Sequence, residues 1–223
     1  MPGTRQITIT TGMSSTHRIE RLLEHPDIWR ASSGSGTGRR VLPTGFAELD
    51  RACAGGWPVG ALTELLSGEQ VFHSLRSFRL LVPALRMLTR DQHRPGRVVL
   101  IDPPCIPYAP GFLAEGLDLS RILVVWRAHR AGCFWSMEQA LRSKACEAVI
   151  AWCESADMHG LRRLQLAAEV GTCLAVLFRP EHCQRERSPA ALRACVKPGQ
   201  PRGMSMELIR RRGGSPRQLF LDA

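Results

Sequence analysis

The residues from Ser67 to Ser74, SGEQVFHS, stand where a phosphate-binding loop is expected. They follow a Gly/Pro turn and the apolar run ALTELL, and an amphipathic pattern comes after them. A working loop needs glycines that let backbone N–H groups wrap the phosphates, a lysine that neutralises them and a hydroxyl that holds magnesium. Gly68 and Ser74 are present, but His73 occupies the place of the lysine. The sequence therefore predicts a degenerate nucleotide loop at Gly68, His73 and Ser74.

The other side chains of this loop also oppose a triphosphate. Glu69 adds a negative charge where phosphates would lie, and Val71 and Phe72 are bulky where glycine would allow close approach. Histidine is also a shorter and weaker cation than lysine. A residual weak nucleotide site, held by backbone donors alone, stays open as an alternative.

The carboxylates that phosphoryl transfer needs for its metal are missing from their expected places. The predicted strand EAVIAWC ends in Trp152 and Cys153, and the next residue, Glu154, fits a turn cap more simply than a displaced metal ligand. Asp102 ends another predicted strand, but two prolines follow it. Because charge compensation is lost twice, we expect no ATP hydrolysis, no catalytic residue, no metal and no cofactor.

The charge balance favours contact with phosphates or acidic protein surfaces. Lysine and arginine number 30 against 20 aspartate and glutamate, a net charge of +10. The predicted DNA or partner contacts lie in a basic, Pro-containing loop over 179–203 and in the cluster IRRRGG. They are Arg185, Arg187, Arg193, Lys197, Arg202, Arg210, Arg211 and Arg212. A solvated basic surface or a loop without a ligand stays open as the alternative.

The pattern of apolar runs predicts an α/β fold with a mostly parallel sheet flanked by helices. Residues 1–40 read as an N-terminal helical arm with a flexible Gly/Ser linker, and residues 41–223 as the core domain. The tail around Gly213 and Gly214 predicts an antiparallel hairpin at the sheet edge. The expected strands are 61–66, 97–102, 121–127, 147–153 and 172–178, and the expected helices 74–90, 135–144 and 158–170.

Eight cysteines without a CxxC pair argue against a zinc site and favour buried free thiols. No run of about 20 uncharged apolar residues is present, and the N-terminus lacks the apolar segment of a signal peptide. We therefore expect a cytoplasmic protein without a membrane partner.

The segment LPTGFAELDRACAGGWPVGALTELL resembles the opening of the RecA-like core, and similar segments continue to the C-terminus. The run GGWPVGALTELL, together with LLEHPDIWR, is most similar to the ImuA family of translesion-synthesis-associated proteins. The shorter SulA family is the nearest competitor. The chain departs from RecA at Phe72, His73, Pro104 and Trp152, so the ATP and magnesium roles of RecA are not carried over. The matching positions are Thr44, Gly45, Leu49, Asp50, Gly55, Gly56, Pro58 and Gly60, then Asp102, Tyr108, Gly116, Leu117 and Asp118.

The resemblance implies a non-catalytic accessory protein of SOS-induced translesion DNA synthesis. Its implied partners are an ImuB-type inactive homologue of Y-family polymerases and an error-prone DNA polymerase III alpha-type subunit, with RecA and DNA as further candidates. Two other hypotheses stay open: a SulA-like cell-division inhibitor acting on FtsZ, and a divergent DNA-dependent ATPase.

Overall fold

The computed structural model describes residues 40–93, 95–126, 130–199, 203–211 and 216–222. The chain divides into two units, Met1–Thr37 and Gly38–Ala223, and all described residues lie in the second. The predicted N-terminal helix and linker lie outside the described residues.

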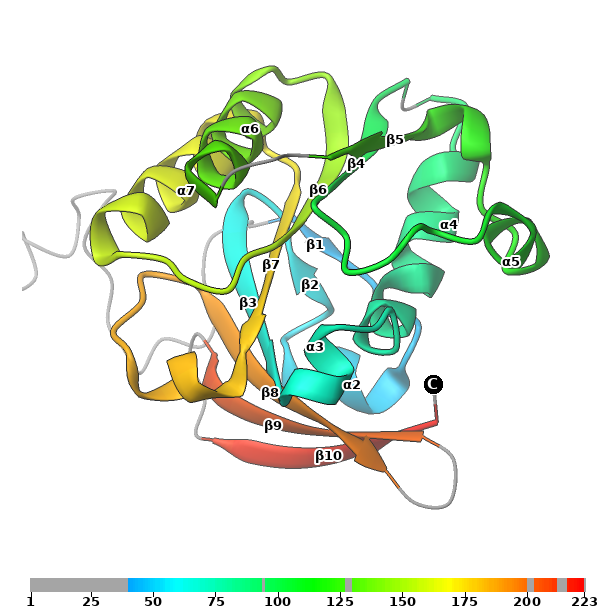
Figure 1. The fold of residues 1–223 in the computed structure, drawn as a ribbon. Coiled ribbons are helices and arrows are strands. Elements are labelled where there is room, and N and C mark those ends of the chain that lie inside the picture. The colour runs from blue at the N-terminus through cyan, green and yellow to red at the C-terminus, as the bar shows by residue number, and fades with distance from the viewer. Residues whose placement is uncertain (1–39, 94, 127–129, 200–202, 212–215, 223) are drawn as a thin grey trace, which may run out of the picture. The chain divides into compact units, whose positions relative to one another are not determined.

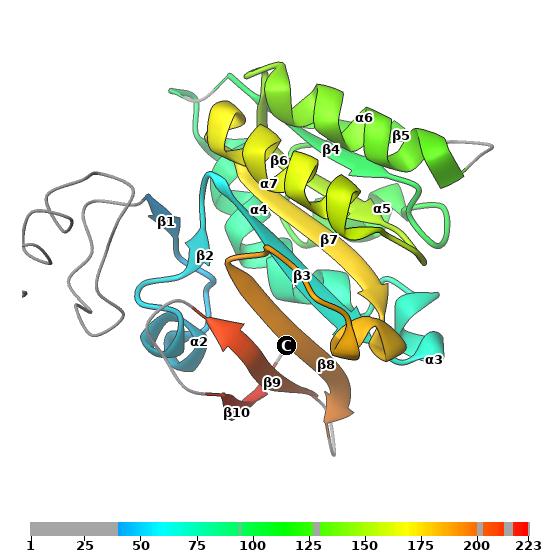
Figure 2. The same ribbon diagram turned by 90° about the vertical axis from the view of Figure 1, so that its left-hand side faces the viewer.

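An eight-stranded sheet is the centre of this unit (Figures 1 and 2). Its strands are β3 (Ala61–Ser67), β4 (Arg97–Ile101), β5 (Ile122–Val125), β6 (Cys146–Trp152), β7 (Leu174–Pro180), β8 (Leu192–Gly199), β9 (Gly203–Arg211) and β10 (Arg217–Leu221). Their order is β10-β9-β8-β3-β7-β6-β4-β5. The strands from β8 to β5 pair in parallel, whereas β9 and β10 are antiparallel. The predicted mostly parallel sheet with a C-terminal antiparallel hairpin is confirmed.

Helices cover both faces of the sheet, which explains why its central strands are continuous apolar runs: every residue of β3 and of β7 is buried. On one face α6 (Arg130–Arg142) packs beside α7 (Met158–Gly171) (Figure 1). The other face carries α2 (Ala47–Ala52), α4 (Val82–Arg90) and α5 (Ala109–Ala114). The Asp157 side chain caps α7 by accepting a hydrogen bond from the Gly160 N–H at 2.7 Å.

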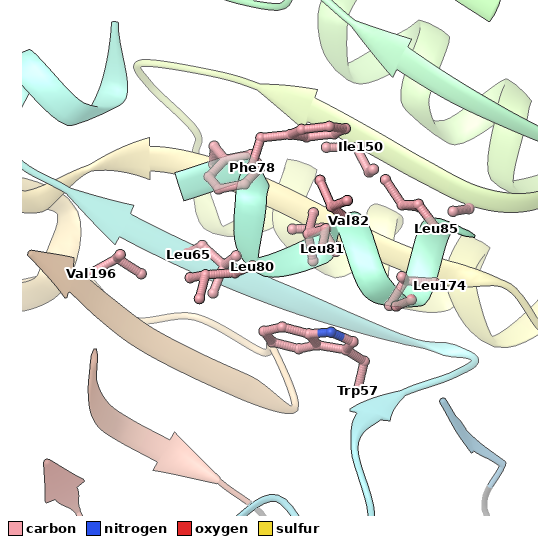
Figure 3. Packing of buried hydrophobic residues seen from close by; sticks show 14 of the residues in the cluster. Trp57, Leu65, Phe78, Leu80, Leu81, Val82, Leu85, Ile150, Leu174 and Val196 are labelled. Carbon is pink, nitrogen blue, oxygen red and sulfur yellow. The ribbon is translucent and has the colours of Figure 1, made fainter. Parts of the chain in front are cut away.

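The larger core cluster lies on the α4 face (Figure 3). Trp57 is fully buried there, in a small two-stranded sheet made of β1 (Val41–Leu42) and β2 (Trp57–Pro58). The rings of Trp152 and Phe178 stack with centroids 4.9 Å apart, and Phe78 lies over Trp152 at 6.1 Å. The strand ends that border the predicted loop therefore rest on a packed aromatic core.

The sequence predicts a helix over 74–90 that Pro83 kinks or interrupts, and the structure forms an α-helix only in the second half of this range. After β3 come a one-turn helix, α3 (Glu69–Phe72), and a 3₁₀ helix, η1 (Ser77–Leu81), and only then α4. Pro83 stands in the first turn of α4. A proline is favoured there, because its missing N–H would have no partner in that turn. Pro83 therefore begins a helix instead of kinking one.

The predicted loop over 179–203 is also wrong in most of its length. Residues 174–180 form β7, residues 192–199 form β8, and a 3₁₀ helix, η3 (Glu181–Arg185), lies between them. Leu192 to Val196 are buried, so β8 is an interior strand of the sheet. The connecting segment is limited to residues 181–191, of which Ala191 donates its N–H to the Leu62 carbonyl at 2.9 Å.

Within the described residues, strand β5 forms one edge of the sheet and pairs with β4 alone. A short 3₁₀ helix, η2 (Leu119–Arg121), leads into it. Leu123 and Val124, on opposite faces of the strand, are 44% and 39% exposed.

Among the described residues, no helix combines the length and the apolar character that a membrane crossing requires.

Candidate functional site

The degenerate loop at the carboxyl end of β3 folds into a helical turn that uses its own backbone donors. The N–H groups of Val71 and Phe72 bond to the Gly68 carbonyl at 3.0 and 2.9 Å, and the His73 N–H bonds to the Glu69 carbonyl at 2.9 Å. In a phosphate-binding loop such groups point at the ligand instead. These three donors are therefore committed inside the protein.

Several side chains of the loop also form contacts within the protein. Val71 and Phe72 are buried in the protein, and the Phe72 ring meets the His73 ring edge to face at 5.1 Å. The Ser74 hydroxyl donates to the Val71 carbonyl at 2.9 Å and accepts from the Arg76 N–H at 3.4 Å. The hydroxyl in the magnesium-binding position thus closes a local turn.

A second carboxylate lies next to the loop. A Cβ built on Gly68 would stand 3.6 Å from Oε2 of Glu181. The other oxygen of Glu181, Oε1, pairs with the ammonium of Lys197 at 3.1 Å. This hydrogen bond lowers the pKa of Glu181 and raises the pKa of Lys197. Lys197 is exposed as predicted, but its charge is balanced by Glu181 and does not stand ready for a phosphate.

Arg193 does not belong to an exposed contact surface, because it is buried in an ion pair. Its Nε donates to Oε2 of Glu64 at 2.6 Å, and Arg179 donates from NH1 to Oε1 of the same carboxylate at 3.1 Å. The side chains of Glu64 and Arg179 are fully buried, and that of Arg193 is 7% exposed. The three residues stand on β3, β7 and β8, so this buried ion network spans the middle of the sheet.

The buried ion network also holds the segment 181–191 over the sheet. Arg193 donates to the carbonyls of Cys183 at 3.0 Å and Glu186 at 3.1 Å. Arg179 donates to the Glu186 carboxylate at 2.7 Å. Burial lowers the pKa of Arg179, but the hydrogen bond that Arg179 donates to Glu186 and the charge of Glu64 raise that pKa overall. Sequence reasoning missed this network, although a glutamate inside ALTELL was its available signal.

Two members of the predicted contact set, Arg185 and Arg187, lie on the segment that this network supports. Arg185 and Arg187 are exposed, and within the described part of the chain neither forms a hydrogen bond or an ion pair. We call Arg185 and Arg187 the basic rim.

The hairpin arginines are partly engaged in structure. Arg210 donates to the Ser188 carbonyl at 2.6 Å, and Arg211 donates to the Ala52 carbonyl. Both stand on β9, where Arg210 is opposite Arg193 of β8. Arg202 and Arg212 lie outside the described residues. The structure thus does not gather the eight predicted contacts into one surface.

The fold and the site define an α/β protein with a mostly parallel sheet, an antiparallel C-terminal hairpin and a modified loop after its central strand. No protein-family model matches the chain, and no curated protein matches it. Among solved structures it is similar in part to SulA from Pseudomonas aeruginosa. That likeness has a TM-score of 0.44 and 25% identity, and covers 53% of this chain and 97% of the SulA chain.

Proposed function

We propose that this protein is a non-catalytic accessory factor of SOS-induced translesion DNA synthesis. In this role it brings together an ImuB-type inactive polymerase homologue and an error-prone polymerase III alpha-type subunit. The proposal rests on the sequence resemblance described above and on one structural observation: the loop after β3 is turned inward while the sheet around it remains fully packed. A fold that keeps its packed core but lacks the groups that bind phosphate fits a docking role better than catalytic turnover of a nucleotide.

The basic rim is the surface that we assign to contact with DNA or an acidic partner. Both arginines are exposed and lie on a segment whose backbone is anchored by the buried ion network, so binding costs little backbone conformational entropy. Arginine suits this task because its planar fork matches phosphate and carboxylate oxygens.

Co-expression of the full chain with an ImuB-type protein, followed by size-exclusion chromatography, tests the proposal. We expect a stable complex, and we expect the double substitution Arg185→Glu with Arg187→Glu to weaken the complex or its binding to DNA. Arg217→Glu is the matched control, because Arg217 is also exposed but stands on β10. Absence of any complex with the unmodified chain would overturn the proposal.

Two further outcomes would replace the proposal. Filamentous cells on overexpression, with the chain bound to FtsZ, would establish the SulA-like alternative. DNA-stimulated ATP turnover that disappears in Ser74→Ala would establish the ATPase alternative. Direct DNA contact is recognised by an affinity that falls steeply with salt, since each neutralised phosphate releases counterions.

A further inference from the structure

A pocket of about 650 Å³ opens at the amino ends of β4 and β5. It lies at the opposite edge of the parallel sheet from the loop after β3, since that loop follows the carboxyl end of its strand. Its lining residues are Thr89, Arg90, Gln92, Pro95, Arg97, Asp118, Ser120 and Arg121. We call it the arginine pocket.

The three guanidinium groups of the arginine pocket are held in place by backbone carbonyls. Arg121 donates to the carbonyl oxygens of Thr89, Asp91 and Gly96 at 2.7 to 3.2 Å, and so ties the end of α4 to the start of β4. Arg90 donates from Nε to the Gly116 carbonyl at 2.8 Å. Arg97 donates from NH1 to the Ser120 carbonyl at 2.8 Å. Each cation is therefore positioned before any ligand arrives.

These bonds leave donors unused. A guanidinium carries five N–H groups, and Arg90 and Arg97 each commit one nitrogen to a carbonyl among the described residues. The remaining N–H groups are free to meet an anion in the pocket. Binding an anion there costs little side-chain conformational entropy, because the arginines are already held by hydrogen bonds.

The charge of the pocket is positive although it contains one carboxylate. Asp118 lines the pocket together with three arginines, and its Oδ1 accepts hydrogen bonds from the N–H and the hydroxyl of Ser120 at 3.0 and 2.7 Å. No ion pair joins Asp118 to an arginine among the described contacts. The described lining therefore holds three guanidinium groups against one carboxylate, which leaves an excess of positive charge.

We propose that the arginine pocket binds a small phosphate-type oxyanion of pyrophosphate size. Forked guanidinium groups match the oxygens of such an anion, and the volume lies in the range of ordinary ligand sites. None of the described residues that line the pocket is aromatic, so no aromatic ring is available there to stack on a nucleobase. The site is separate from the basic rim and does not depend on the proposed function.

Titration calorimetry of the full chain with pyrophosphate, at low ionic strength and without phosphate buffer, tests this site. We expect saturable binding that Arg97→Gln weakens by about tenfold, since one charge-assisted contact is removed. Arg97→Lys keeps the charge but loses the planar fork of the guanidinium. Its affinity for pyrophosphate should lie between those of the unmodified chain and Arg97→Gln. Asp118→Asn should bind more tightly than the unmodified chain, because a repelling charge is removed while an acceptor for Ser120 remains.

Three controls make the result decisive. Arg217→Gln, on β10, and Ser74→Ala, in the degenerate loop, should both leave pyrophosphate binding unchanged. The melting temperatures of all variants without ligand show whether each is folded. The proposal is overturned if the unmodified chain shows no saturable binding, if Arg217→Gln weakens binding as much as Arg97→Gln, or if Ser74→Ala abolishes it.

Discussion

At the scale of single residues, we expect Glu64 to contribute strongly to the free energy of unfolding. It is fully buried between two arginines, and its removal would leave both cations without a buried counter-charge. We predict that Glu64→Gln lowers the free energy of unfolding by about 3–5 kcal/mol, because breaking one side of a buried ion pair strands the other. Urea denaturation monitored by circular dichroism measures the change.

An exposed glutamate provides the control for that experiment. Glu48 stands on α2 and is exposed, so Glu48→Gln should change stability by no more than about 0.5 kcal/mol. Equal effects of the two substitutions would show that the buried ion network contributes nothing of its own.

The cysteines give a second prediction at this scale. Cys105 is exposed, whereas burial raises the pKa of Cys173 and Cys195 to about 12 and that of Cys53 to about 11. At pH 8 the three raised thiols stay protonated and react slowly with a disulfide reagent. We expect a fast phase in the native protein that Cys105→Ser removes. A fast phase that survives this substitution would contradict the assignment.

At the scale of elements, two glycines with opposite surroundings make a matched pair. A Cβ on Gly171, at the end of α7, would lie 2.0 Å from the Leu141 carbonyl of α6, a backbone atom that cannot yield easily. We predict that Gly171→Ala destabilises the protein by about 1–3 kcal/mol, despite the better helix propensity of alanine. Thermal unfolding measures the effect.

Gly68 is the control for Gly171. Its φ of −60° suits any residue, and an added Cβ would meet only Glu181 at 3.6 Å. Gly68→Ala should therefore be nearly neutral, within about 0.5 kcal/mol. A large loss of stability in Gly68→Ala would mean that the glycine still serves the turn as it does in a phosphate loop.

The elements also show what sequence reasoning can and cannot reach. Continuous apolar runs located β3, β4, β6 and β7, because a strand buried on both faces has no polar side. The strand β8 was missed because its sequence, LRACVKPG, contains an arginine whose partner lies 129 residues away in the chain. A long-range ion pair leaves no local signal, so Arg193 looked like a surface residue. The absence of the lysine of a phosphate-binding loop, in contrast, could be predicted from the sequence of the loop alone.

At the scale of the whole molecule, the inward turn of the degenerate loop predicts that nucleotide binding is not restored by one residue. His73→Lys returns the missing cation, but the backbone donors stay inside the helical turn and Glu69 and Glu181 still flank Gly68. We expect no binding of magnesium-ATP to His73→Lys in titration calorimetry. Micromolar affinity in this variant would show that charge alone had disabled the site.

The open edge at β5 sets a practical limit on the isolated protein. Exposed apolar side chains lie there beside backbone groups that no strand in the described part of the chain covers, and such an edge favours edge-to-edge association. Light scattering by concentrated samples should increase with time. Val124→Lys should suppress this increase, because a charge on an edge strand opposes association. Val170→Lys, on an exposed face of α7, is the control and should leave the increase unchanged. Colloidal behaviour would then depend on a single four-residue strand.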